Sequence, residues 1–288
     1  MSHVPRQYSE PDSAHAARRA DLRPGRAWFS RAATDQARQA CRQLALGDAT
    51  LKATIKQQPT RVEHVQLGSE QFILKRFGVG GWVQAAMCLL RQSRAWREWR
   101  NAHRLDRAGV RICLPLALID QRHDRPRQQW LVLPFVQGPT LNDWLGAAPP
   151  PGQWSHAYRR QRINLACLIG EQIGQMLGAG IINRDTKPSN MILDERCLAG
   201  HAMPMLIDPA GLRRRRSERQ VHRMLAVLDR AAARVGTVTR GEQLVCLKAV
   251  LAKDSGLAGP GSMGERLRRV ARAVARQRAR RPDSYTPD

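Results

Sequence analysis

The chain has 288 residues and a formal net charge of +24, from 48 lysines and arginines against 24 aspartates and glutamates. Its hydrophobic fraction of 42% is ordinary for a globular protein and excludes fibrous, collagen-like and wholly disordered classes. No apolar run approaches the ~18 residues that cross a bilayer, and Met1 to Pro5 are not an apolar secretory signal. We therefore expect a cytoplasmic protein.

Two features of the composition bear on partners and on redox state. The six cysteines are scattered without CxxC pairs, which predicts reduced, mostly structural thiols. A surface of charge +24 attracts polyanions such as nucleic acid, an anionic membrane leaflet or an acidic glycolipid. The aromatic and basic residues do not alternate as in a groove for single-stranded nucleic acid, so a nucleic-acid partner is disfavoured.

The first half of the chain is expected to form a sheet and one helix. Residues 1 to about 30 are polar and predict a loose tail, followed by a short helix over 32–46. Alternating apolar residues and turn signals then predict three strands that form two hairpins, at 51–56, 62–67 and 71–75. The next elements expected are a helix starting at Gly80-Gly81 and covering 82–107, then strands at 116–119 and 130–136.

The second half is expected to be mostly helical. A Pro-rich loop at 147–152 precedes helices predicted at 158–177, 217–235, 241–252 and 264–280. The chain therefore divides into a polar N-terminal extension over 1–45, a sheet-containing lobe over 46–136, and a helical lobe over 137–288. The fold class is α+β.

The segment from Ile181 to Leu193 resembles the catalytic loop of protein kinases. In such a loop Asp185 accepts a proton from the acceptor hydroxyl, or orients that hydroxyl. Lys187 neutralises charge on the transferred phosphoryl group. Asn190 lies across the loop, where its amide oxygen can bind a metal that bridges the phosphates.

Three further residues complete the kinase-like pattern. Asp208 follows an apolar strand, as a metal-binding aspartate does in these folds. Lys75 lies on the third predicted strand and would grip the α- and β-phosphates of ATP, and Glu98 on the following helix would pair with it. Each feature alone is weak, but their order and placement together predict a two-lobed protein-kinase-like fold.

The chain also resembles a narrower family, the bacterial lipopolysaccharide kinases (Kdo/WaaP), over about residues 50 to 250. The resemblance rests on the residues at 74–77, 80–81, 93–101, 105, 108–110 and 115–118, and most specifically on Ser93-Arg94-Ala95-Trp96-Arg97-Glu98-Trp99. Enzymes of this family phosphorylate a sugar of the lipopolysaccharide inner core with ATP and a divalent metal. The resemblance therefore implies ATP and Mg²⁺ as cofactors and a sugar hydroxyl as acceptor.

The sequence departs from protein kinases at four places. Asn183 stands where a histidine usually opens the loop, at a position with a mainly structural role. Gln57 to Arg61 replace the glycine-rich loop, and Pro209-Ala210 replace Phe-Gly. No long activation segment follows Asp208, which argues for a small or lipid-linked acceptor rather than a peptide.

Basic residues behind Asp208 suggest how an anionic acceptor is held. Arg213 and Arg214 are predicted to contact its phosphates or carboxylates, within a run that extends to Arg216. Residues 211–288 carry 19 basic and 7 acidic side chains. The last helix is basic and amphipathic, so it either docks on the lobe with a solvated basic face or lies on an anionic membrane.

The sequence thus predicts an ATP-dependent kinase that phosphorylates a glycolipid sugar, peripherally bound to the inner face of the cell membrane. Adenine is expected beside Leu133 and Phe135 on the strand that ends there. Two alternatives stay open: another kinase-like enzyme acting on a small molecule or on protein Ser/Thr, and a pseudokinase that only binds. The missing glycine loop and Pro209-Ala210 favour the pseudokinase, and the joint presence of the proposed site residues speaks against it.

Overall fold

We describe the protein from a computed structural model. It describes residues 18–22, 25–31, 33–46, 50–56, 60–79, 81–121, 128–215, 217–235, 237–254, 256–257 and 259–279. The chain separates into two compact units: unit 1 is Met1–Arg100 with Leu114–Phe135, and unit 2 is Asn101–Cys113 with Val136–Asp288. The domain ranges 1–45, 46–136 and 137–288 stay a prediction.

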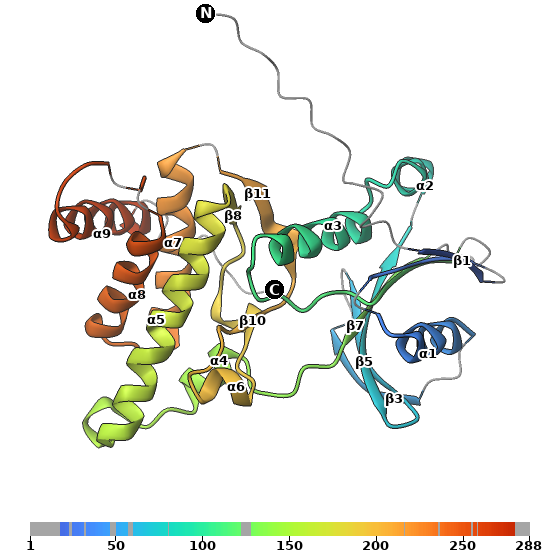
Figure 1. The fold of residues 1–288 in the computed structure, drawn as a ribbon, viewed down its shortest axis with the longest axis horizontal. Coiled ribbons are helices and arrows are strands. Elements are labelled where there is room, and N and C mark those ends of the chain that lie inside the picture. The colour runs from blue at the N-terminus through green and yellow to red at the C-terminus, as the bar shows by residue number, and fades with distance from the viewer. Residues whose placement is uncertain are drawn as a thin grey trace, which may run out of the picture. The chain divides into compact units, whose positions relative to one another are not determined.

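Unit 1 is built on a seven-stranded antiparallel sheet of order β1-β2-β6-β7-β5-β4-β3 (Figure 1). Its strands are β1 (Arg18–Leu22), β2 (Gly25–Phe29), β3 (Thr50–Lys56), β4 (Arg61–Leu67), β5 (Glu70–Gly78), β6 (Ala117–Gln121) and β7 (Gln128–Pro134). The five predicted strands are confirmed, with ends that move by up to three residues.

The predicted loose tail is wrong for residues 18–22 and 25–29, which form β1 and β2. Ala27 and Phe29 are buried in the core of the sheet, opposite Ile119 and Ala117 of β6. This pairing is tertiary, and a five-residue strand with two inward apolar residues is too short to show a period in the sequence. Residues 1–17, 23 and 24 of the predicted tail lie outside the described residues.

The two faces of the sheet carry different helices. On one face α1 (Asp35–Leu46) contributes Ala40, Cys41 and Leu44 to a core that also holds Phe72, Leu74 and Trp130. On the other face lies α3 (Arg94–Arg107), whose first half belongs to unit 1. The side chains on this face alternate with core residues along their strands, and three of them contact α3 or its cap. Trp28 contacts Trp96, Lys75 contacts Glu98, and Gln129 contacts Ser93.

The single helix predicted over 82–107 is two helices, α2 (Gly81–Leu89) and α3. The break has a local cause. Arg91 adopts the left-handed region at φ 55°, which ends α2, and the backbone N–H of Trp96 donates to Ser93 Oγ at 3.3 Å, which caps α3. The predicted stop is confirmed, since α3 ends at Arg107 and Gly109 adopts φ 72°. Gly80 lies outside the described residues.

Unit 2 is mostly helical, as predicted. Its helices are α4 (Leu141–Gly146), α5 (His156–Gly178), α6 (Glu195–Leu198), α7 (Glu218–Val235), α8 (Arg240–Lys253) and α9 (Met263–Ala279). Glycines let α5 and α8 approach closely: a Cβ on Gly170 would lie 2.2 Å from the Cys246 carbonyl oxygen, and one on Gly174 would lie 2.8 Å from that of Val250. Two short antiparallel ladders complete the unit, β8 (Ile181–Asn183) with β11 (Leu212–Arg214) and β9 (Met191–Ile192) with β10 (Met205–Leu206).

The C-terminal helix α9 is docked on α7 and α8 (Figure 1). Val270 is fully buried, and Ala271, Val274 and Ala275 line a mostly apolar cavity of 420 Å³ together with aliphatic residues of α5, α7 and α8. The Arg266 guanidinium donates to the carbonyls of Leu251, Asp254 and Leu257. The apolar face of α9 therefore points into unit 2.

The six cysteines are the next feature on which the sequence made a prediction. All six cysteines are free thiols, and burial raises the pKa of Cys41 and Cys246 to about 12 and that of Cys197 to about 11. Such thiols are protonated and unreactive at neutral pH. Among the helices of the described ranges, none has the length and apolar character that a membrane span requires.

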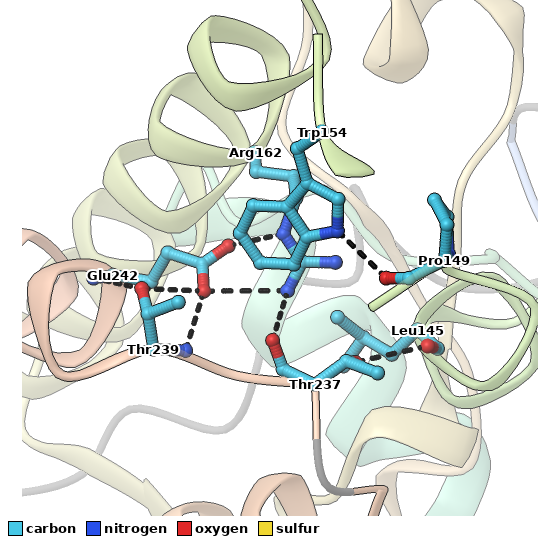
Figure 2. Close-up of polar contacts among 7 residues, drawn as sticks. All are labelled: Leu145, Pro149, Trp154, Arg162, Thr237, Thr239 and Glu242. Atoms are coloured by element: carbon cyan, nitrogen blue, oxygen red, sulfur yellow. Dashed lines mark hydrogen bonds and ion pairs between the residues drawn. The ribbon is translucent and has the colours of Figure 1, made fainter. Parts of the chain in front are cut away.

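A buried arginine joins three parts of unit 2 (Figure 2). The Arg162 side chain of α5 is 1% exposed, and its Nε lies 2.5 Å from Glu242 Oε1 on α8. Its Nη2 donates to Glu242 Oε2 at 3.2 Å and to the Thr237 carbonyl at 3.0 Å. The guanidinium also stacks on the Trp154 ring, 4.0 Å from its centroid. Glu242 closes a capping box with Thr239 at the start of α8, so the ion pair fixes that helix end to α5.

Removing one charge of this pair should destabilise the protein strongly. Glu242→Gln keeps the shape but leaves a buried guanidinium without its counter-charge, which costs about 3–5 kcal/mol. Urea denaturation measures the loss. Asp35→Asn is the control, because it breaks an ion pair with Arg38 in which the Asp35 carboxylate is 97% exposed. This variant should leave the midpoint of urea denaturation unchanged. Equal effects of the two variants would contradict a stabilising role for the buried pair.

Candidate active site

In unit 1 the predicted lysine and glutamate form an ion pair. Lys75 lies in the middle of β5, and its Nζ is 3.2 Å from Glu98 Oε2 on α3. Both side chains are largely buried, at 12% and 1% exposure. The sheet and α3 therefore place a lysine ammonium at a fixed position beside a desolvated carboxylate.

The Ser93–Glu98 stretch explains how that carboxylate is held. Ser93 caps α3 and its hydroxyl donates to Gln129 Oε1 on β7 at 2.5 Å, which ties the start of the helix to the sheet. Ala95 is fully buried where the helix meets the sheet. Arg94 Nε reaches Glu98 Oε1 at 3.3 Å, so two cations share the glutamate. This second cation was not predicted from the sequence, although its i, i+4 spacing from Glu98 is a pattern that could have indicated it.

The residues predicted to contact adenine lie on the same side of the sheet as Lys75. Lys75 pairs with Leu131 of β7, and Leu133 lies two residues further along the same face. Leu133 is buried, whereas Phe135, just after β7, is 38% exposed and stacks on His64 with centroids 4.2 Å apart. Of the segment that replaces the glycine loop, residues 57–59 lie outside the described residues.

In unit 2 the predicted catalytic loop is fixed at both ends by short ladders. β8 delivers Asn183, which is buried, and its Oδ1 accepts from the Asp185 backbone N–H at 3.1 Å. The Asn183 carbonyl accepts from Thr186 Oγ1 at 2.8 Å. Asn183 thus takes the structural role expected at this position.

Three predicted residues meet within the loop. Lys187 Nζ is 3.3 Å from Asp185 Oδ1. Asn190 Nδ2 donates to the Asp185 carbonyl at 2.9 Å and to Asp185 Oδ2 at 3.2 Å. Asp185 is only partly buried. The carboxylate is therefore oriented from two sides and still accessible to a reactant.

Asp208 is brought to the same loop by the β9–β10 ladder. The Ile207 backbone N–H donates to the Asn190 carbonyl at 2.9 Å, so Asp208 follows directly after the residue opposite Asn190. Asp208 adopts φ 56°, ψ 72°, a left-handed conformation that aspartate tolerates better than most residues. The chain then turns into Pro209, whose carbonyl accepts from Asn101 Nδ2 at 2.9 Å. Asn101 belongs to the stretch that carried the family resemblance, but its role was not predicted.

Asn190 and Asp208 suit a magnesium ion. The Asn190 amide nitrogen is turned to Asp185, which directs the amide oxygen to the other side. Carboxylate and amide oxygens are ligands that Mg²⁺ accepts, and the ion commonly takes one or two protein ligands with the rest from phosphates and water. Within the described ranges, no group of three His, Cys, Asp or Glu side chains could hold a metal.

The four arginines from 213 to 216 do not act alike. Arg213 and Arg214 lie exposed on β11, opposite Ile182 and Ile181 of β8. Arg215 turns inward and pairs with the buried Asp254 of unit 2, and its backbone N–H donates to the Gly180 carbonyl at 2.8 Å. Arg215 is therefore structural. Arg216 lies outside the described residues.

A sequence profile of the lipopolysaccharide kinase (Kdo/WaaP) family matches residues 84–246, more than half of the chain. The protein belongs to this family. The resemblance predicted from the sequence is confirmed, and the protein is a kinase. The matched range includes Glu98, the catalytic loop, Asp208 and β11, whereas Lys75 precedes it.

The fold agrees with that of a solved Kdo/WaaP kinase. The structure described as "WaaP in complex with acyl carrier protein" superposes with a TM-score of 0.57 at 20% sequence identity, over 82% of this chain and 90% of that chain. The predicted α+β kinase-like fold, an antiparallel sheet unit and a mostly helical unit, is confirmed. A comparison with curated protein sequences gives no match.

Gly211 is a residue of this family member that sequence reasoning missed. Its carbonyl accepts from the Arg184 backbone N–H at 3.0 Å. A Cβ at this position would lie 2.6 Å from Asn183 Oδ1, 2.9 Å from the Asp185 backbone nitrogen and 3.0 Å from Asp185 Cβ. Only glycine permits this approach, so the backbone after Asp208 sets the position of Asp185.

Gly211→Ala should therefore displace the loop. A shift of this size in a catalytic group lowers turnover by about 10–100-fold, since misplacement of about 1 Å has that effect. ADP release from ATP measures it, with thermal melting to show that the fold persists. Gly152→Ala is the control, because nothing lies within 4 Å of a Cβ there. Full activity of Gly211→Ala would show that the loop tolerates the added methyl.

Proposed function

We propose that this kinase transfers the γ-phosphoryl group of ATP to a sugar hydroxyl of an anionic glycolipid such as the lipopolysaccharide inner core. The observation that carries the proposal is the arrangement of Asp185, Lys187, Asn190 and Asp208 around one loop of unit 2. Membership of the lipopolysaccharide kinase family supports the acceptor class.

The unit 1 residues are proposed to bind the nucleotide. Lys75 holds the α- and β-phosphates, and Glu98 fixes its ammonium in place through the 3.2 Å contact. Leu133 and Phe135 offer apolar surface to adenine on the Lys75 side of the sheet. Arg94 also pairs with Glu98, so the Glu98 carboxylate keeps a positively charged partner when Lys75 binds phosphate.

The unit 2 residues are proposed to carry out the transfer. Asn190 and Asp208 hold Mg²⁺, which neutralises phosphate charge when bound. Asp185 accepts the proton of the acceptor hydroxyl as the oxygen forms its bond to the γ-phosphorus and the bond to the ADP oxygen breaks. Lys187, 3.3 Å from Asp185, balances the negative charge on the transferred group.

Arg213 and Arg214 are proposed to bind the acceptor. Both are exposed on β11, and β11 is paired with β8, which leads into the catalytic loop. Arginine binds phosphate and carboxylate groups through two parallel N–H donors. An acceptor that already carries such groups would thus be held beside Asp185.

Nucleotide binding and chemistry should be separable by two substitutions. Mg-ATP at 100 times its Kd should stabilise the wild-type protein by roughly 2.7 kcal/mol, seen as a rise in Tm. Asp208→Ala should lose the Mg²⁺-dependent part of that rise. Asp185→Asn should keep the rise, while turnover falls by roughly 10²–10⁴-fold because the base is gone. A wild-type Tm unmoved by millimolar Mg-ATP would favour a pseudokinase, and an active Asp185→Asn would remove Asp185 from the mechanism.

The acceptor site has its own test. The double variant Arg213→Ala, Arg214→Ala should raise the KM for the lipopolysaccharide acceptor and leave the KM for ATP nearly unchanged, as steady-state kinetics can show. The matched control is Arg159→Ala, Arg160→Ala, which removes two exposed arginines from α5. A change in the ATP KM instead would assign these arginines to the nucleotide site. Transfer to a protein substrate but not to lipopolysaccharide would support the alternative kinase function.

A further inference from the structure

The helix α2 of unit 1 exposes an unusual amount of apolar surface. Trp82 is 82% exposed, Val83 55%, Leu89 62% and Leu90, just after the helix, 66%. Met87 adds a further exposed side chain. Half of the large exposed hydrophobic side chains among the described residues thus fall within nine consecutive positions. Contiguous apolar surface of this kind marks an interaction site in a globular protein.

The exposed side chains share one face of α2. At 100° per residue, Trp82, Val83, Leu89 and Leu90 fall within about a third of a turn, and Met87 borders them. The residues turned to the protein are small: Cys88 is buried and Ala85 is partly buried. The helix therefore packs through its small side chains and presents its large apolar ones outward, the reverse of an ordinary surface helix.

Basic side chains directly follow this apolar face. Arg91, Arg94, Arg97 and Arg100 are exposed, and Arg97 and Arg100 lie one turn apart on α3. Glu98 is the only acidic residue between positions 81 and 100, and it is buried under Lys75 and Arg94. Figure 1 shows α2 beside the N-terminal end of α3. The surface of this segment is therefore apolar and cationic.

The C-terminal helix does not offer a comparable surface. Ala271, Val274 and Ala275 of α9 line the cavity inside unit 2, Val270 is buried, and the exposed side of the helix carries arginines. Within the described ranges, α2 is the helix that places several large exposed apolar side chains next to exposed arginines, whereas α5 and α8 each expose one, Ile163 and Leu244. Its nine residues are far fewer than the ~20 that span a bilayer, so it suits the interface, where tryptophan is favoured.

We propose that α2 and the arginines at 91, 97 and 100 dock the kinase onto an anionic lipid bilayer. Trp82, Leu89 and Leu90 enter the headgroup region with the helix lying flat, and the arginines contact lipid phosphates. The inference deepens the proposed function, because it brings the enzyme to the membrane that presents a lipid-linked acceptor. The binding itself requires neither nucleotide nor acceptor.

Vesicle sedimentation tests the docking surface. Wild-type protein should bind phosphatidylglycerol-rich vesicles about tenfold or more tightly than pure phosphatidylcholine vesicles, and added salt should weaken the binding. The variant Trp82→Ser, Leu89→Ser should lose about tenfold or more of it. The matched control Leu51→Ser, Ile55→Ser removes two exposed apolar side chains from β3 of the same unit and should bind as wild type. Equal binding by both double variants would overturn the proposal.

Tryptophan fluorescence separates insertion from surface adhesion. Brominated lipid tails should quench part of the wild-type emission, and Trp82→Phe should abolish that quenching, because Trp28, Trp96, Trp99 and Trp130 of unit 1 are buried and the partly buried Trp144 and Trp154 belong to unit 2, outside the proposed docking surface. Unchanged quenching in Trp82→Phe would contradict insertion of α2. Light scattering tests whether a second copy of the protein covers α2 instead. A dimer that forms without lipid and is dissociated by Trp82→Ser, Leu89→Ser would identify a second copy as the partner of α2 and would overturn the proposal of membrane binding.

Activity on a detergent-solubilised acceptor keeps this test apart from that of the proposed function. Trp82→Ser, Leu89→Ser should turn over that acceptor as the wild type does, and lose rate only on vesicles. If the protein binds vesicles but transfers no phosphate, the proposed function is contradicted and the proposed docking surface is supported. If the protein turns over the acceptor normally but does not bind anionic vesicles, the proposed function is supported and the proposed docking surface is contradicted.

Discussion

The candidate active site of unit 2 depends on the hydrogen bonds of Asn190. Its side-chain nitrogen holds the Asp185 carbonyl and carboxylate, and its backbone carbonyl holds Ile207, the residue before Asp208. One residue therefore joins the loop that carries the proposed base to the strand that carries the proposed metal ligand. Replacing it would remove a proposed metal ligand and would also release both acidic residues from their fixed positions, so its proposed chemical role and its structural role cannot be separated by a single substitution.

Arginine serves the interior of this protein as well as its surface. Arg162 is buried with Glu242, Arg111 pairs with Asp194, and Arg215 pairs with Asp254. Arg111 lowers the pKa of Asp194, which favours the ionised pair at neutral pH. Each pair links segments distant in sequence, and the planar guanidinium can bond several acceptors at once, as lysine cannot. Part of the arginine excess is therefore structural, whereas the exposed arginines set the net charge of +24.

The sequence predicted what depends on local pattern. The catalytic loop, Asp208 and the Lys75–Glu98 pair could be placed because their residue types, spacing and order along the chain match a kinase-like pattern, and the structure shows that the pair forms. It could not show β1 and β2, which are held by pairing with β6, nor the break at Arg91, whose cause is one backbone dihedral angle. Gly211 was missed because its importance lies in a contact with Asp185, 26 positions earlier in the chain.

The catalytic loop and α2 differ in how their side chains are held. Around the catalytic loop the side chains of Asn183, Thr186 and Asn190 each bond to a backbone group of the same loop, as a fixed geometry requires. In α2 the large side chains of Trp82 and Leu89 are exposed to water. The fold therefore forgoes the favourable free energy that burying this apolar area would give. A soluble monomer gains nothing from that exposure. An enzyme whose acceptor is anchored in a lipid layer gains proximity to it, because the same apolar area is buried when the helix meets the membrane.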